Sequence, residues 1–483
     1  MTAESTAAAP EALPRARVDR GRQPPRWAVI TVVLVLAVLV TDLFAQALWP
    51  LLRADDWPYL LPAHTPGTID NWAKNLREGR WLNYLWWLAI GQHTTTTWAS
   101  VTHVTAYVLF VAGLWRLLWR DDRRTHWAVQ VLVGLALFAS VTWVQLLYWP
   151  ATQVSSALVA AAGVWTLPLA ARRRGRFGAW LLVVTVLSVL SYPPVAAVLF
   201  VAAVVHLGRM PWRRLLLLTL GWVGSFALGV GVIYTLNWFA FGHFGLEIAA
   251  WRHPNPLHDL ASLRTNVRRA ASSAAGLLRL SPVATVAGVL AVVAGLLSPV
   301  VRPLMTRLLV ALAVVAGLEA AQTVVTGVAT APRGELWIWL ALVLPAVLLL
   351  RDPGVWSRVG MGMLAVLAVV GLVTWRTDVV GHQQTRQQYD AIVAAATRPG
   401  PGGSRPEVVF YQDHEGRTHL PGQTMAGVLW MMVRQGQDRV PRWCRGAECT
   451  QIARAAAGSD GFVVRVGSVV GVVVPPPPDW VKG

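Results

Sequence analysis

The stretch WAVITVVLVLAVLVTDLFAQALW, residues 27–49, is followed almost at once by RADDWPY, residues 53–59. The first segment is an apolar run longer than the roughly 20 residues that an α-helix needs to cross a membrane. It is too long for the core of a signal peptide, and no clear small-residue cleavage site follows it. We therefore expect a retained membrane helix with two adjacent carboxylates, Asp55 and Asp56, just beyond its end.

The composition of the whole chain agrees with a membrane protein. Of its 483 residues, 55% are hydrophobic, only 14% are charged and 26 are tryptophan, and the mean hydropathy is +0.48. A soluble chain of this length carries more charge, and tryptophan is enriched at membrane–water interfaces. The net charge of +18 would suggest nucleic acid in a soluble protein. Here the arginines stand between apolar runs, so we expect lipid headgroups and no nucleic acid as partners.

Eleven apolar runs bounded by polar turns predict the transmembrane helices of an all-α polytopic membrane protein. Two of them, 177–191 and 195–208, are short and flank SYPP, so they form either two short or tilted helices or one broken re-entrant pair. The predicted spans are 27–49, 98–118, 127–148, 153–170, 177–191, 195–208, 215–238, 280–299, 308–330, 336–350 and 357–375.

Arginine-rich short loops fall on one side of this predicted bundle. They include RDDRR at 120–124 and RRRGR at 172–176, whereas the opposite short loops hold one arginine between them. The positive-inside rule then places a disordered tail, residues 1–26, in the cytoplasm, and the long loops 50–97 and 239–279 outside. The Arg-, Ala- and Val-rich, lysine-poor composition is typical of high-GC bacteria, so we expect a bacterial plasma membrane.

Residues 376–483 change character and predict a small α/β domain outside the cytoplasm. The only two cysteines of the chain, Cys444 and Cys449, lie in it. In an oxidising compartment they are expected to form a disulfide. The elements expected in this domain are a strand at 407–411, a helix at 425–435 and a hairpin within 462–474 around Gly467 or Gly471.

The first long loop adds cations to the carboxylate pair. Lys74, Arg77 and Arg80 recur at spacings of three, and on one helix they would form a cationic edge. Cations beside carboxylates at a membrane surface suit lipid-phosphate chemistry. The cations hold the phosphate, and a carboxylate takes a proton from an attacking hydroxyl.

The segments RADDWPYL and NWAKNLREGRWLNYLWW, within residues 53–87, resemble the first outer loop of GT-C membrane glycosyltransferases. The likeness is greatest to the branch of phage-type O-antigen glucosyltransferases, in which a DD pair precedes a W…GR element. The motif match covers about residues 53 to 81, and the hydropathy layout agrees over most of the chain. The resemblance implies transfer of a sugar from a polyprenyl-phosphate donor to a cell-envelope glycan or glycolipid acceptor outside the cytoplasm.

The same resemblance implies roles for particular residues. Asp55 or Asp56 would be the general base, and the other would orient the acceptor. In metal-using members of the family, the aspartate that is not the base would help to hold a divalent cation, Mg²⁺ or Mn²⁺. Candidate cations for the donor phosphate are Lys74, Arg77, Arg80 and Arg333.

Other polar residues leave alternatives open. Arg333 is equally interpreted as a partner of Glu335 or an interface anchor. Asp42 and Glu319 lie within predicted spans, where an ionisable residue indicates function. They keep open a lipid-linked glycan transporter or flippase, although no internal repeat supports one. A non-catalytic envelope assembly protein is a third alternative. In the loop 239–279, the candidates for the acceptor or a lipid headgroup are Arg252, His253, Arg268 and Arg269.

Overall fold

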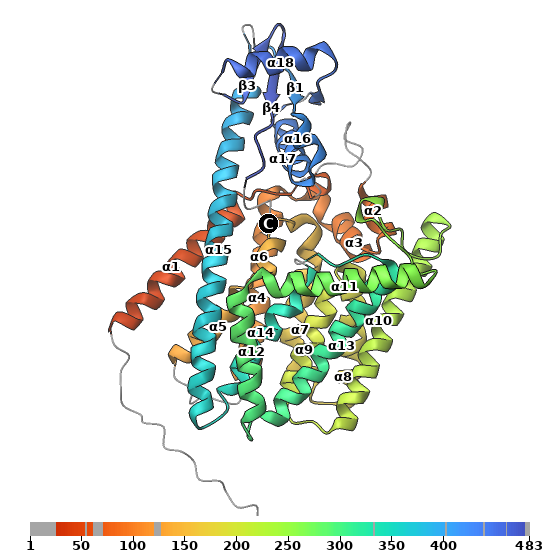
Figure 1. The fold of residues 1–483 in the computed structure, drawn as a ribbon, viewed down its shortest axis with the longest axis vertical. Coiled ribbons are helices and arrows are strands. Elements are labelled where there is room, and N and C mark those ends of the chain that lie inside the picture. The colour runs from red at the N-terminus through yellow and green to blue at the C-terminus, as the bar shows by residue number, and fades with distance from the viewer. Residues whose placement is uncertain are drawn as a thin grey trace, which may run out of the picture.

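The computed structural model describes residues 26–53, 56–60, 71–119, 127–331, 334–400, 403–437, 440–459 and 461–478. Within these ranges the architecture is that of a helical membrane protein with a small sheet at one end (Figure 1). We call the end of the bundle that carries the sheet the domain end. Within the described ranges, the short arginine-rich connections between helices lie at the opposite end (Figure 1).

Seven helices of the described chain are long and apolar enough to cross a membrane. Four shorter apolar helices accompany them, and each of the eleven helices overlaps one predicted run. The run at 127–148 is not a single helix, because α5 ends at Phe138 and only the short helix α6 (Trp143–Leu146) follows. The long helices are α1 (Arg26–Leu48), α4 (Thr96–Trp119), α7 (Pro150–Ala170), α8 (Arg174–Ser191), α10 (Trp212–Phe241), α13 (Arg302–Thr326) and α15 (Val355–Ala396). The shorter ones are α5 (Trp127–Phe138), α9 (Pro194–Leu207), α12 (Pro282–Leu297) and α14 (Leu336–Leu349).

The SYPP segment separates two distinct helices. Helix α8 ends at Ser191, and α9 begins at Pro194. Proline has no backbone N–H and a fixed φ, so it favours the first turn of a helix and cannot extend the preceding one. The two helices pack against each other.

Small residues allow the helices of the bundle to pack closely. A Cβ added at Gly113 of α4 would lie 2.3 Å from a methyl group of Val164 on α7, and one at Gly163 would lie 2.7 Å from Leu199 on α9. Such contacts are typical of membrane helices, which associate by close packing of small residues.

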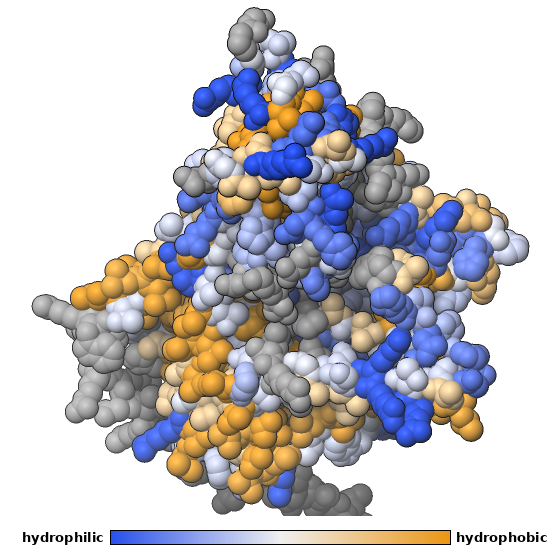
Figure 2. All heavy atoms as spheres, turned by 45° about the horizontal axis from the view of Figure 1, so that its top comes forward, coloured by the Kyte–Doolittle hydropathy of each residue, from blue (hydrophilic) through white to orange (hydrophobic). Residues whose placement is uncertain are grey.

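The outer surface of the bundle is apolar. Large hydrophobic residues such as Leu34, Phe44, Leu217 and Leu297 are more than half exposed in the isolated chain. Figure 2 shows hydrophobic residues gathered on the bundle and hydrophilic residues more frequent over the C-terminal domain. This distribution fits a bundle surrounded by lipid tails.

One longer helix and several short ones cover the domain end of the bundle. One amphipathic helix, α11 (Leu260–Leu280), crosses the front of the bundle (Figure 1). Asp259 caps it, and its carboxylate accepts from the backbone N–H of Ser262 at 2.6 Å. The others are η1 (Trp57–Leu60), α2 (Asn71–Arg77), α3 (Trp81–Ala89), η2 (Gly91–His93), α6 (Trp143–Leu146) and η3 (Ala250–Arg252).

The C-terminal region contains a four-stranded sheet in the order β2-β1-β4-β3. Strand β1 is parallel to β2 and β4, and β3 and β4 form an antiparallel hairpin that turns at Gly467, where φ is +59°. The strands are β1 (Glu407–Tyr411), β2 (Arg442–Trp443), β3 (Val463–Val466) and β4 (Val469–Val473). The helices are α16 (His414–Thr418), α17 (Leu420–Gly436) and α18 (Ala447–Ala457), and Cys444 forms a disulfide with Cys449.

Helix α15 joins the bundle to the sheet. It runs without a break through residue 376, where the sequence placed the start of the C-terminal domain, and ends at Ala396. Its last turns pack into the same apolar core as Phe410 and Met425 of that domain. Leu51 and Leu52, just before the DD pair, are buried in this core too. The C-terminal domain therefore holds one end of the loop that carries Asp55 and Asp56.

Candidate functional site

Asp56 is completely buried at the start of α7. One carboxylate oxygen accepts hydrogen bonds from the backbone N–H and the hydroxyl of Thr152, at 2.9 and 2.8 Å. The other accepts from the backbone N–H of Ala151 at 2.8 Å. The first N–H groups of a helix lack partners within the helix and carry partial positive charge. Asp56 therefore fixes the DD loop to α7 by satisfying these groups.

A second attachment lies just before the pair. The backbone N–H of Arg53 donates to the carbonyl of Tyr148 at 3.1 Å, and its guanidinium lies 5.3 Å from the ring centre of Trp149. The loop is thus tied to residues 148–152 on both sides of Asp55. Asp55 itself, the other candidate base, lies outside the described residues.

The surroundings of Asp56 do not fit a divalent cation. Its oxygens face N–H and O–H donors, whereas a metal site needs several oxygen ligands converging on one point. Within the described residues there is also no group of three His, Cys, Asp or Glu side chains that could hold a metal ion.

The predicted cationic edge is broken in the structure. Helix α2 ends at Arg77, and the chain turns at Gly79, where φ is +93°, before α3 begins. Arg80 is the N-cap of α3 and so does not continue the helical edge of Lys74 and Arg77. Only glycine adopts this φ without strain, which explains why the three residues do not share one helix.

The turn between α2 and α3 is held rigidly against the end of α10. Asn237, which is 1% exposed, donates to the carbonyls of Arg77 and Gly245 at 3.1 and 2.6 Å. It also accepts from the indole N–H of Trp81 at 2.9 Å. A buried amide that makes three hydrogen bonds fixes the backbone that presents Arg77 and Arg80.

Glu78 joins the two long loops of the domain end. Its side chain is 9% exposed and lies 3.1 Å from the guanidinium of Arg252 and 3.8 Å from that of Arg80. Nearby, Arg77 pairs with Glu247 at 3.0 Å in a more exposed position. Arg77 and Arg80 of the first loop therefore meet Arg252 of the second in one cluster, which we call the REGR cluster: Arg77, Glu78, Arg80, Glu247 and Arg252.

No family model, curated protein or solved structure matches this chain. The function must therefore be argued from the site itself.

The remaining predicted cations lie in different places. Lys74 is exposed on α2, and Arg333 falls outside the described residues. Arg268 is exposed on α11. Arg269 donates to the carbonyls of Gly327 and His253, at 2.7 and 2.9 Å, and so ties α11 to the two adjacent loops. The structure thus gives Arg269 an anchoring role and leaves Arg268 facing outward.

The acidic residues of the predicted spans have partners. Asp42 on α1 forms an ion pair with Arg376 on α15. Glu319 on α13 has Glu335 as a neighbouring carboxyl group, and Glu335, which precedes α14, accepts from the indole N–H of Trp337 at 3.0 Å. Burial raises the pKa of Glu335, and its interactions with Glu319 and with the indole N–H of Trp337 oppose that shift.

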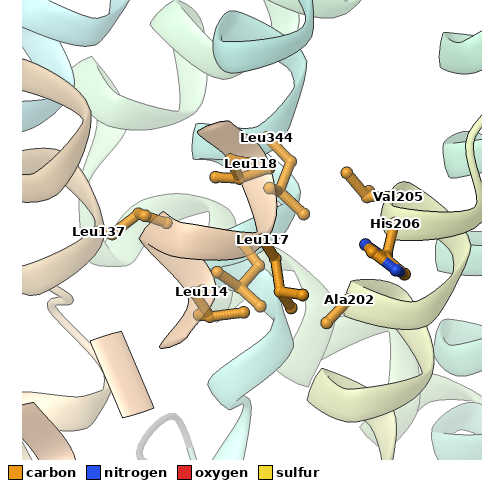
Figure 3. Close-up of a pocket in the computed structure, with 9 residues that line it drawn as sticks. Leu114, Leu117, Leu118, Leu137, Ala202, Val205, His206 and Leu344 are labelled. Atoms are coloured by element: carbon orange, nitrogen blue, oxygen red, sulfur yellow. The ribbon is translucent and has the colours of Figure 1, made fainter. Parts of the chain in front are cut away.

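A pocket at the end of the bundle opposite the sheet has no carboxylate or arginine in its wall. It lies between α4, α5, α9 and α14, and eight of its nine lining side chains are leucine, valine or alanine, among them Leu117 and Leu344 (Figure 3). His206 is its one ionisable residue. We assign no part of the candidate site to it.

Sequence reasoning missed Glu78 and Asn237. Glu78 lies inside the segment that carried the resemblance, and Asn237 lies just before the second long loop. Neither spacing nor composition indicates that Glu78 would meet Arg252, because the two residues are 174 positions apart.

Proposed function

We propose that this protein is a membrane glycosyltransferase that moves a sugar from a polyprenyl-phosphate donor to a cell-envelope glycan or glycolipid. The observation that carries the proposal is the REGR cluster on the same end of the bundle as the anchored DD loop. An anionic lipid donor needs fixed cations at the membrane surface, and an acceptor hydroxyl needs a base beside them. The resemblance of residues 53–81 to GT-C enzymes supports the same function.

In this proposal the two aspartates have different roles. Asp56 is a positioning residue, because its oxygens are buried and occupied by α7. Asp55 is the general base. Its carboxylate removes the proton of the acceptor hydroxyl, whose oxygen attacks the anomeric carbon of the donor sugar. The bond from that carbon to the phosphate oxygen breaks, and polyprenyl phosphate leaves with the electron pair.

The leaving phosphate gains negative charge, which guanidinium groups stabilise. Arg80 and Arg252 are the proposed phosphate ligands, since they come from different loops and are held through Glu78. Arg77, Lys74 and Arg333 are proposed as further contributors. Arg77 already pairs with Glu247, so phosphate would have to compete with that carboxylate.

The proposed reaction takes place outside the cytoplasm. The positive-inside rule puts the arginine-rich connections inside and the domain end outside, with eleven membrane crossings. The sheet domain and its disulfide then lie in an oxidising compartment, where disulfides persist.

Donor titrations at fixed acceptor test the role of the cluster. Arginine grips phosphate with two N–H groups, which lysine cannot copy. We expect Arg252→Lys and Arg80→Lys to raise the donor KM by about tenfold, the equivalent of one lost charge-assisted contact. The acceptor KM should stay unchanged. Arg358→Lys, an exposed arginine at the opposite end of the bundle, is the matched control. Equal donor KM values in all three variants would contradict this assignment.

A transporter is the second candidate, because the carboxyl groups of Glu319 and Glu335 are neighbours between α13 and the start of α14. Ionisable residues in membrane segments often belong to the proton relays of transporters. Translocation of a lipid-linked sugar in proteoliposomes, driven by a pH gradient and lost in Glu319→Gln, would favour this candidate. Sugar transfer that Glu319→Gln leaves unchanged would exclude it.

A further inference from the structure

A pocket lies beside the anchored DD loop and has no role in the proposed phosphate site. It is formed by η1, α3, η2, α4 and α7 and encloses about 340 Å³ of empty space, including solvent at its mouth. Ala151, whose backbone N–H donates to Asp56, is part of its wall. The pocket therefore borders the α7 terminus to which the DD loop is fixed.

Aromatic rings make up much of the wall. Tyr59, Trp86 and Trp87 all line the pocket. Trp87 also packs against Trp72, with ring centres 5.1 Å apart, and Trp72 packs against Tyr59 at 4.3 Å. These contacts hold the rings in place without a ligand. Rigid aromatic faces offer a large apolar contact area at little entropic cost.

The pocket also offers a small number of polar groups. The side chain of Trp87 is 8% exposed, and its indole N–H has no hydrogen-bond partner among the residues that the structure describes. Buried indole N–H groups usually have a partner, so this donor is available to a ligand. Thr94 and Thr102 donate their hydroxyl protons to the carbonyls of Gly91 and Trp98, both at 2.8 Å. Their oxygens can therefore accept hydrogen bonds from a ligand.

We propose that this pocket binds one sugar ring of the acceptor. A sugar ring has apolar C–H faces that fit against aromatic rings, and hydroxyl groups that both accept and donate hydrogen bonds. Trp87 supplies the donor, and Thr94 and Thr102 supply acceptors. Assigning the ring to the acceptor rests on the proposed function, because the pocket adjoins the loop of the proposed base. The binding of a sugar ring rests on the pocket alone.

Saturation-transfer NMR on the full chain in nanodiscs tests the binding. The probes are methyl glycosides of common hexopyranoses and pentofuranoses at millimolar concentration, with farnesyl phosphate as an isoprenoid probe. We expect transfer from aromatic protons of the protein to ring protons of at least one glycoside. Trp87→Phe keeps an aromatic ring, smaller than indole, and loses the N–H, so the affinity should fall by about 2- to 10-fold, as for one neutral hydrogen bond.

Two further variants make the result specific to the pocket. Thr102→Trp fills the pocket from the half-buried side of α4 and should abolish the glycoside signal. Trp98→Phe is the control, because Trp98 is 64% exposed and is not part of the pocket wall. Its signal should equal that of the wild type. Size-exclusion chromatography and thermal unfolding confirm that each variant is folded.

Three outcomes would overturn the proposal: no signal from any glycoside, a signal from farnesyl phosphate alone, or glycoside signals equal in the wild type, Trp87→Phe and Thr102→Trp. None of them depends on sugar transfer. A protein that binds glycosides in this pocket but transfers no sugar would leave the pocket proposal intact and contradict the proposed function. Sugar transfer by a protein that binds no glycoside in this pocket would support the proposed function and contradict the pocket proposal.

Discussion

Glu78 is expected to stabilise the domain end far more than Glu247 does, although both are glutamates paired with arginine. Glu78 is 9% exposed, and its partners Arg80 and Arg252 are 25% and 32% exposed. Glu247 and Arg77 are 58% and 44% exposed. Solvent screens the second pair, whereas removing Glu78 leaves two guanidinium groups with reduced access to water and without their carboxylate.

The size of the effect follows from this difference in exposure. Breaking a fully buried ion pair costs about 3–5 kcal/mol, and an exposed pair is worth about 0.2–1 kcal/mol. Because its arginines are partly solvated, Glu78→Gln should lower the free energy of unfolding by about 2–3 kcal/mol, between these limits. Glu247→Gln should lower it by less than about 1 kcal/mol.

Unfolding by SDS in mixed micelles, followed by tryptophan fluorescence, measures both free energies. A double-mutant cycle of Glu78→Gln with Arg252→Gln then isolates the coupling, expected at about 1–3 kcal/mol for groups in direct contact. The corresponding cycle of Glu247→Gln with Arg77→Gln is the control. Equal losses for the two glutamates, or no coupling between Glu78 and Arg252, would refute the view that Glu78 joins the two loops.

Three other predictions concern the aspartates, the disulfide and the topology. Asp55→Asn should lower the rate of sugar transfer by about 100- to 10,000-fold without loss of stability. Asp56→Asn should instead lower the free energy of unfolding by about 1–3 kcal/mol. Transfer assays and SDS unfolding measure both effects, and a stability loss in Asp55→Asn with a stable Asp56→Asn would contradict the assignment. Replacing Cys444 and Cys449 by alanine should destabilise the C-terminal domain by about 2 kcal/mol, and unchanged thermal unfolding would contradict this. A membrane-impermeant protease on intact cells stripped of outer layers should remove the C-terminal domain, and full protection would overturn the topology.

The helices of the bundle were predictable because each one carries an apolar run. Hydropathy alone located a helix within every run, and the prolines of SYPP marked a real break between α8 and α9, but hydropathy did not show that the run at 127–148 breaks after Phe138. The strand at 407–411 and a hairpin at Gly467 or Gly471 also followed from local pattern, since β-branched residues and glycine act within a few positions, and the structure places the turn at Gly467.

Hydropathy predicts the end of this helix at residue 375, because charged residues follow, whereas α15 continues to Ala396. Residues 376–396 are polar on average, yet Val379, His382, Tyr389, Ile392 and Ala396 are buried at helical spacing. That periodicity was present in the sequence and would have extended the helix. The apolar face of this segment packs against the C-terminal domain, not against lipid.

The site was harder to predict than the fold because its contacts are long-range. The doublet Asp55–Asp56 is visible in the sequence, but the partner of Asp56 is the start of α7, about a hundred residues away. Likewise, the spacing of Lys74, Arg77 and Arg80 suggested one helix, and Gly79 was the local signal against it. Periodicity identifies elements, whereas contacts between distant loops depend on how those elements pack.

The central claim is that the protein transfers a sugar from a polyprenyl-phosphate donor to an acceptor, with Asp55 of the DD loop as the general base. The most direct measurement incubates purified protein in liposomes with a panel of radiolabelled polyprenyl-phosphate sugars and a cell-envelope glycan fraction as acceptor. The account predicts label in the acceptor from at least one donor, and its loss in Asp55→Asn at unchanged stability. Absence of transfer from every donor, or wild-type transfer in the Asp55→Asn and Asp56→Asn double variant, would contradict it.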